Sequence, residues 1–426
     1  MLSLGPVLAQ LATLSLGDRS EVRYIAPEDK HYEATTRPFV ALGLRTRQLT
    51  LAAGYSPSIT VIPLEDNATR EVLLFHTLYL AVTRTWGRTW LTVSENAGLG
   101  EQNFRTVGLT DTRFPQTPTG APPTSAPPTT TPPAGMPPTN TPPTGTPPTG
   151  QPTQGTNPVR AYGNEPIAYV NSTTTIGLTH QATAAISYYE EVSYLVSGST
   201  RDEDRALYPL IKGPRFLTTL RYRTSRVDEF VATAMAQYAA SSLGTSVWIG
   251  TGTGTWVHKL SPTTATQLGA GLGFSRTPLY LGFVMYSIYP VLNASITDTS
   301  RLGRGKLGTS VGVSSAPVVD ITTGAADPRL GFYSLINWKR DRFTALLTAD
   351  SSVSIAQSTS DSGALAATRG SLTAASGSAG VSYGLTKTFS VDTGIRVTYQ
   401  SYRDRVTIPL NYAAFVGFSF GLQQQL

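Results

Sequence analysis

Residues Phe389–Tyr402 read FSVDTGIRVTYQSY, and their side chains alternate in character. Successive side chains of a β-strand point to opposite faces, so a strand with this sequence has one largely apolar face and one charged face. The apolar face holds Phe389, Val391, Thr393, Ile395, Val397, Tyr399 and Ser401. A soluble sandwich would pack this face on a core, whereas a membrane barrel would turn it to lipid and turn Asp392 and Arg396 toward a wet lumen.

The composition of the whole chain favours the barrel. Of the 426 residues only 14% are charged, against roughly 25% in a typical soluble domain, and the mean hydropathy is nevertheless −0.08. Thr, Ser, Gly and Tyr replace the missing charge, and these residues suit strands, tight turns and a polar interior. No run of about 18 apolar residues occurs, so the sequence predicts no membrane-spanning helix, whereas barrel strands need no such run.

Cysteine usage and charge distribution exclude several classes of function. The chain contains no cysteine, which excludes disulfides, thiolate catalysis and C-x-x-C-H haem attachment. A cysteine-free chain suits a protein that crosses an oxidising periplasm before it folds. The net charge of +6 is scattered along the chain, so we predict no nucleic-acid partner.

The same alternation recurs along the chain, for example in PFVALGLRTRQLTLAAGYS, where Val40, Leu42 and Leu44 share one face. In RFLTTLRYR, residues 215–223, the arginines lie on one face of the predicted strand, and Phe216 and Leu220 lie on the other face. In AAISYYEEVSYLV, residues 184–196, Glu191 lies on the polar face of the predicted strand. The other face is apolar except at Glu190. Inward arginines suit a water-filled pore, and tyrosines near strand ends suit the aromatic girdle of a membrane barrel.

Loop lengths alternate in a way that gives the topology. Short turns are predicted at Thr46–Gln48, Trp86–Arg88, His180–Thr183, Thr224–Asp228, Lys259–Thr263, Lys339–Arg342 and Leu385–Thr388. Longer connections are predicted at Pro63–Arg70, Ser199–Gly213, Gln357–Gly370 and Arg403–Leu410, and at a central linker. Outer-membrane barrels have short periplasmic turns and long extracellular loops, so the long connections are expected outside the cell. The stretch Pro290–Pro328 fits either two strands or one strand with a long turn.

The linker and the N-terminus divide the chain into four parts. Residues 114–158 repeat Pro-Pro-Thr units with Gly, Ala or Ser, and this composition predicts a disordered spacer, either a tolerated loop or a surface stalk. Residues 1–9 read as a signal-peptide remnant ending at Ala9, with a first strand as the alternative. Residues 10–113 and 159–426 are predicted to form the barrel strands.

The C-terminal region resembles a known class of protein. GVSYGLTKTFSVDTGIRVTYQSY is similar to the penultimate hairpin of a bacterial outer-membrane porin-type β-barrel, and YAAFVGFSFGL is similar to the closing strand. The resemblance places Tyr412, Ala414, Val416, Phe418, Phe420 and Leu422 on the lipid face. It departs from the class at the end, where GLQQQL stands in place of a terminal aromatic residue.

The expected fold is an all-β, transmembrane, antiparallel up-and-down barrel of 16 to 18 strands. Eighteen strands are favoured and 16 stay open. The resemblance implies the bacterial outer membrane, with the lipid bilayer, lipopolysaccharide and small hydrophilic solutes as partners, and it leaves room for periplasmic or extracellular protein partners. A barrel of roughly 16–18 strands leaves an aqueous channel, so a pore is expected.

Candidate chemistry is confined to the lumen wall. The four histidines, His31, His76, His180 and His258, show no metal-ligand spacing, and GTGTGTW, residues 250–256, is neither a nucleophile elbow nor a phosphate loop. We therefore predict no catalytic residue, metal or cofactor, and no enzyme. The pore-lining candidates are Arg45, Glu191, Arg221, Arg223, Asp392 and Arg396, which together favour weak anion selectivity.

Three functions remain open on the sequence. The favoured one is passive diffusion of small hydrophilic solutes through an outer-membrane channel. The second is the barrel component of an envelope complex, which exports polysaccharide or sheaths an electron-transfer cytochrome. The third is a structural or adhesive barrel that displays the Pro/Thr stalk.

Overall fold

The structure is a computed structural model, and it describes ten segments of the chain. These are residues 11–26, 31–46, 48–63, 70–102, 167–206, 208–278, 284–319, 326–354, 372–402 and 405–425. The predicted signal remnant and the Pro/Thr spacer lie outside the described residues. The described residues contain no helix that is long and apolar enough to cross a membrane.

Strands make up nearly all of the described chain. They are β1 (Leu11–Ala26), β2 (His31–Arg45), β3 (Leu49–Pro63), β4 (Arg70–Trp86), β5 (Thr89–Gln102), β6 (Ile167–Gln181), β7 (Ile186–Ser199), β8 (Ile211–Arg223), β9 (Asp228–Ser241), β10 (Ser246–Lys259), β11 (Thr264–Pro278), β12 (Val284–Leu302), β13 (Gly305–Val319), β14 (Ala326–Arg340), β15 (Phe343–Ser354), β16 (Leu372–Gly384), β17 (Phe389–Tyr402) and β18 (Arg405–Gln425). The one helical element described is a short 3-10 turn, η1 (Glu203–Ala206).

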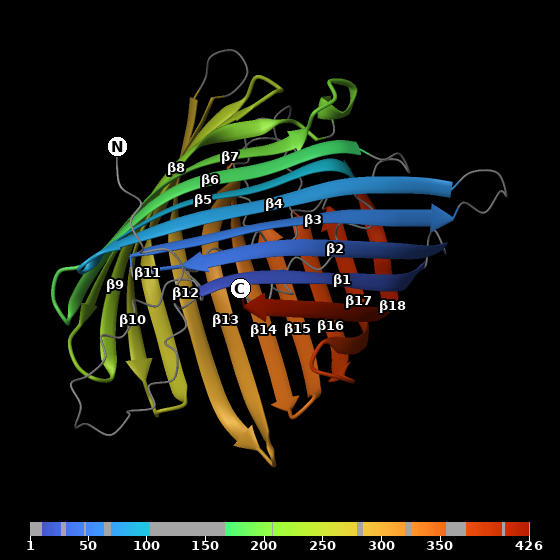
Figure 1. The fold of residues 1–426 in the computed structure, drawn as a ribbon. Coiled ribbons are helices and arrows are strands. Elements are labelled where there is room, and N and C mark those ends of the chain that lie inside the picture. Colours follow the sequence, from blue (N-terminus) through green and yellow to red (C-terminus); the bar gives the residue numbers. More distant parts are fainter. Residues whose placement is uncertain are drawn as a thin grey trace, which may run out of the picture.

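The strands form one closed sheet (Figure 1). Each strand pairs antiparallel with its neighbours in the sequence, and β1 also pairs with β18, from Thr13 opposite Gln425 to Ala26 opposite Tyr412. This pairing removes both sheet edges and confirms an up-and-down barrel of 18 strands rather than 16. In Figure 1 the strands of one wall cross the direction of those behind them, as tilted barrel strands do.

The apolar face of each strand points out of the barrel. On β17 Ile395 is 55% exposed, and on β18 Val416 and Phe418 are 47% and 46% exposed. Their registers place Thr393 opposite Val416 and Val391 opposite Phe418, so the apolar set of FSVDTGIRVTYQSY continues onto the closing strand. A soluble sandwich would cover such residues, whereas here they form the outer surface that faces lipid. The predicted lipid face of β18 is confirmed.

Short connections lie at one end of the barrel, as the sequence predicts, although the β9–β10 connection at the other end, residues 242–245, is equally short. At one end of the barrel, the short-turn end, eight hairpins join β2 to β3 and so on to β16 and β17. Seven were predicted from the sequence, although the β6–β7 turn occupies residues 182–185, two residues later than expected. The eighth, Gly303 and Arg304 between β12 and β13, resolves the stretch Pro290–Pro328 into two strands.

One predicted loop is wrong. The stretch Arg403–Leu410 was expected to be a long connection, but β18 begins at Arg405. The register between β17 and β18 shifts between Thr398 and Gln400 and again between Gln400 and Tyr402. With these two irregularities β18 extends toward the N-terminus beyond YAAFVGFSFGL, the closing strand that the alternation predicts.

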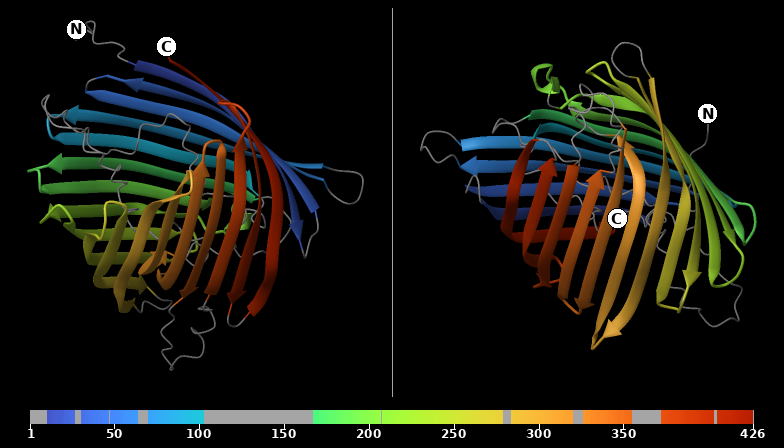
Figure 2. Two further views of the ribbon diagram at one scale, coloured as in Figure 1. Left: turned by 90° about the horizontal axis from the view of Figure 1, so that it is seen from below. Right: turned by 180° about the vertical axis from the view of Figure 1, so that it is seen from behind.

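An apolar corner of the inward face lies on β8, β9 and β10. Ile211, Ala239, Val247 and Ile249, at the ends of β8, β9 and β10 away from the short turns, are almost fully buried. Ala326, the first residue of β14, packs against them. These apolar contacts join the ends of β8, β9 and β10 to the start of β14. Figure 2 shows the barrel wall from below and from behind.

Candidate functional site: the charged lumen wall

The inward face carries a first group of charges on β17, β1 and β2. This β17–β2 cluster consists of Arg19, Glu21, Arg23, Glu33, Arg37, Asp392 and Arg396. Arg19 Nη2 donates to Asp392 Oδ2 at 3.1 Å and lies 3.8 Å from Glu21 Oε2. Arg23 Nε pairs with Glu21 on the next inward position of the same strand. Period-two alternation explains this arrangement, because the residues at 19, 21 and 23 of one strand share a face.

The backbone leaves room for this cluster. Gly417 of β18 lies opposite Asp392 and opposite Glu21, between β17 and β1. A Cβ atom at Gly417 would lie 2.7 Å from Asp392 Oδ2, which is too close. The glycine therefore lets the carboxylate lie against the strand and reach across β18 to Arg19.

A second group of charges lies on β7, β8 and β9. In this β7–β9 cluster Glu191 accepts from Arg215 Nη2 at 3.1 Å and from the Tyr189 hydroxyl at 2.5 Å. Nearer the short turns, Arg221 Nη1 lies 3.7 Å from Glu229 Oε1. Glu191 accepts from donors on its own strand and on β8, and Glu229 forms an ion pair with Arg221 across β8 and β9, so the cluster is a network along the wall rather than isolated charges.

The six sequence-predicted pore residues all lie at inward positions by register. Glu191 and Arg221 lie in the β7–β9 cluster, and Asp392 and Arg396 lie in the β17–β2 cluster. Arg45 and Arg223 are the last residues of β2 and β8, so they lie at the rim of the short-turn end. The barrel thus brings the six candidates onto two separate parts of its wall.

Sequence reasoning missed several members of these clusters. Arg19, Glu21 and Arg23 fall in LGDRSEVRY, where the alternation is readable but the outward positions include Asp18 and Ser20 and blur the apolar face. The pair Arg19–Asp392 joins residues 373 positions apart. Only the closure of β18 onto β1 brings them together, and no local pattern encodes that step.

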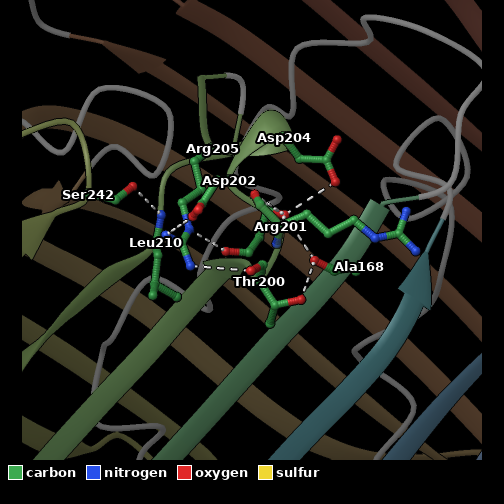
Figure 3. Close-up of polar contacts among 9 residues, drawn as sticks. Ala168, Thr200, Arg201, Asp202, Asp204, Arg205, Leu210 and Ser242 are labelled. Carbon is green, nitrogen blue, oxygen red and sulfur yellow. Dashed lines mark hydrogen bonds and ion pairs between the residues drawn. The ribbon is translucent and has the colours of Figure 1, made fainter.

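The connection from β7 to β8 is fixed at the long-loop end (Figure 3). The Arg205 guanidinium donates to the Thr200 carbonyl at 3.2 Å and pairs with Asp202. The Thr200 amide donates to the Ala168 carbonyl of β6 at 2.9 Å, and the Leu210 amide donates to Ser242 Oγ at 3.0 Å. This connection is therefore tied to β6 on one side and to the β9–β10 turn on the other.

The remaining polar groups of the described strands and turns contain pairs of acidic or histidine side chains but no larger constellation of them. Within the described segments, no group of three or more His, Asp or Glu side chains is placed to hold a metal ion. His258 Nδ1 and Asp228 Oδ1 are 2.7 Å apart, but Ser225 donates to the same carboxylate and not to the histidine. The glycines of GTGTGTW face outward beside the alanines of β9, so they do not admit a plug into the lumen.

Comparisons with known proteins find likeness only at the level of structure. No protein-family model and no curated protein matches the sequence. The FrpB iron transporter from Neisseria meningitidis, in its apoprotein form, is 9% identical with a TM-score of 0.50, over 91% of this chain and 62% of that one. OpdK from Pseudomonas aeruginosa, solved with vanillate, is 7% identical with a TM-score of 0.47, over 98% and 100% of the two chains. OccAB4 from Acinetobacter baumannii is 10% identical with a TM-score of 0.41, over 99% and 100%.

The fold and the surface define the class. This chain spans less than two thirds of FrpB, and at 9% identity the likeness extends to the fold and no further. A closed 18-stranded antiparallel barrel with an apolar outer surface and a charged inner wall is a porin-type barrel of the bacterial outer membrane. The sequence-based prediction of class and location is confirmed.

Proposed function

We propose that this protein is an outer-membrane channel for passive diffusion of small hydrophilic solutes. The observation that carries the proposal is the division of the wall into an apolar outer face and a charged inner face around a closed 18-stranded barrel. Barrels of roughly 16–18 strands leave an aqueous interior. The charges of the inner wall keep this interior wet.

The balance of charge supports weak anion selectivity. The β17–β2 cluster holds four arginines, at 19, 23, 37 and 396, and three carboxylates, at 21, 33 and 392. The β7–β9 cluster holds Arg215 and Arg221 with Glu191 and Glu229, and Arg45 and Arg223 add two positive charges at the short-turn rim. The β17–β2 cluster and the short-turn rim therefore carry an excess of positive charge, and arginine-rich pore walls favour anions. Because most of these charges lie near an opposite charge, the selectivity is expected to be small.

The test is single-channel recording of the refolded protein in a planar bilayer. Stable conductance steps, with a reversal potential in a KCl gradient that indicates chloride preference, are expected. A folded barrel that gives no steps would reject free diffusion and favour a component of an envelope complex. A reversal potential of the opposite sign would reject the assignment of anion selectivity while leaving the channel in place.

A further inference from the structure

The inner face of the short-turn end carries a row of three basic side chains. Arg301 of β12 lies directly opposite Lys306 of β13, and Lys306 lies directly opposite Lys339 of β14. Each of the three is exposed and lies one residue from the end of its strand. Alternation turns them inward, because the other face of these strands holds exposed apolar side chains such as Ile296 and Phe332. In Figure 1 the β12–β13 hairpin lies at the lower edge of the barrel.

This basic row brings like charges side by side. Directly opposite residues of antiparallel strands have Cα atoms about 4.5–5.5 Å apart, and like charges in such a pair destabilise the sheet. Lys306 lies between two cations, so the repulsion acts on it from both sides. The row is therefore unfavourable for folding unless a negative charge lies against it.

The protein itself does not supply this negative charge. In the described part of the chain no carboxylate forms an ion pair with Arg301, Lys306 or Lys339. The two acids nearest along these strands are engaged elsewhere, since Asp341 lies 3.9 Å from Arg340 and Asp298 faces outward. The basic row thus differs from the two charge clusters of the lumen, in which the arginines have acidic partners.

The positions beside the basic row are open and can donate hydrogen bonds. One step further from the strand ends, the inward residues are Thr299, Gly308 and Asn337, which again lie opposite one another. A Cβ atom at Gly308 would meet only a backbone oxygen, at 3.8 Å, so the centre of this second row has room for a ligand. Thr299 and Asn337 are exposed and offer a hydroxyl and an amide as donors.

Charge and spacing favour a phosphate-type anion. Adjacent strands lie about 4.8 Å apart, so the basic row covers about 10 Å. A phosphate group carries about 1.5–2 negative charges at pH 7 on three acceptor oxygens, whereas a carboxylate carries one. Arginine binds phosphate through paired donors, and lysine binds it as a point charge. Two linked phosphates can therefore balance three cations within the length of the row.

We propose that the basic row and the open positions beside it form a binding site for a compact solute with two or more phosphate groups. Outer-membrane barrels have short periplasmic turns, so the site lies at the periplasmic mouth. The inference rests on the proposed channel for the route of the solute, but binding itself needs no open pore. A phospholipid headgroup offers the same chemistry but lies around the barrel, whereas the row faces the lumen.

Calorimetric titration with inorganic pyrophosphate tests the site on the protein refolded in a zwitterionic detergent. Wild type should bind pyrophosphate saturably, and should bind the dicarboxylate succinate more weakly. A charge about 5 Å away in water changes a binding constant roughly fourfold, so Lys306→Gln should weaken pyrophosphate binding about four- to tenfold. Lys387→Gln is the matched control, because Lys387 is exposed in the β16–β17 turn at the same end, outside the row. It should bind nearly as wild type does.

Urea unfolding of the same proteins checks that the variants fold and that the row repels itself. Without pyrophosphate, Lys306→Gln should be at least as stable as wild type, because the substitution removes two like-charge contacts. Pyrophosphate should stabilise wild type against urea, and should stabilise Lys306→Gln less, since a ligand stabilises the state that binds it.

Four results would overturn the proposal. Equal weakening in Lys306→Gln and Lys387→Gln would mean that the net charge of the rim, and not the row, attracts the anion. Equal affinity for succinate would reject a phosphate-type ligand. Competition by phosphatidylglycerol added to the micelles would assign the row to lipid headgroups. Conductance steps in a planar bilayer without saturable pyrophosphate binding would reject the site alone, whereas binding without conductance would support the site and reject the channel.

Discussion

Gly417 shows how a single residue supports the charged wall. Its missing side chain leaves space for the Asp392 carboxylate, which would lie 2.7 Å from a Cβ atom at this position. Gly417→Ala should therefore push the carboxylate away from Arg19 and cost about 0.5–1.5 kcal/mol of unfolding free energy, the usual net contribution of one hydrogen bond. Urea titration of the protein refolded in vesicles measures this cost.

Gly421→Ala is the matched control for this change. Gly421 faces inward four residues further along β18, and a Cβ atom there would meet nothing within 4 Å. The control should change the unfolding free energy by less than about 0.5 kcal/mol, as surface substitutions usually do. If both variants lost the same stability, the close packing of Asp392 against β18 would not be the cause.

At the scale of the element, the β12–β13 hairpin depends on its turn. Gly303 has φ of 62°, in the left-handed region, and Asp341 occupies the corresponding conformation, with φ of 49°, in the β14–β15 turn. A residue with a Cβ atom loses about 1–2 kcal/mol there, although Asp tolerates it better than most. Gly303→Ala should therefore lower the unfolding free energy by about 1 kcal/mol, whereas Asp341→Gly should leave it unchanged or raise it slightly.

Equilibrium unfolding of the two variants, measured beside Arg304→Ala in the same turn, checks this prediction. Arg304 is an exposed turn residue and its truncation should have little effect. A loss of stability in Arg304→Ala equal to that in Gly303→Ala would mean that the side chains, and not the backbone conformation, stabilise the hairpin.

The same hairpin shows where the sequence alone is insufficient. Prolines at 290, 317 and 328 lower the strand signal, because proline cannot donate to a sheet ladder. In the structure Pro317 lies directly opposite Pro328, so two missing donors fall at one place between β13 and β14. Hairpins such as β16–β17, in which apolar and polar residues alternate without proline, are predictable to the residue.

At the scale of the whole molecule, the faces are predictable but the clusters are not. Alternation within a strand assigns Asp392 and Arg396 to the inner wall, since that assignment needs only neighbouring residues. The contact of Asp392 with Arg19 needs the closure of β18 onto β1.

Two consecutive residues of β7 test the assignment of one strand face to lipid and the other to the lumen. Glu190 and Glu191 of β7 carry the same side chain, but Glu190 faces lipid beside Thr218 and Glu191 faces the lumen beside Arg215. In Glu191→Gln the Arg215 charge is no longer balanced, and an ion about 10 Å away in water feels a change of about 0.4 kcal/mol, or about twofold in permeability ratio. Chloride preference should therefore rise in Glu191→Gln and stay unchanged in Glu190→Gln, as measured by reversal potentials in a KCl gradient.

Ionic strength separates this electrostatic effect from a change in pore shape. The Debye length falls from about 10 Å at 0.1 M salt to about 3 Å at 1 M, so the effect of Glu191→Gln should nearly vanish in the more concentrated solution. A shift that persists at 1 M would mean that the loss of the contacts to Arg215 and Tyr189 has reshaped the wall. An equal shift in Glu190→Gln would contradict the assignment of faces on β7, and with it the position of the β7–β9 cluster in the lumen.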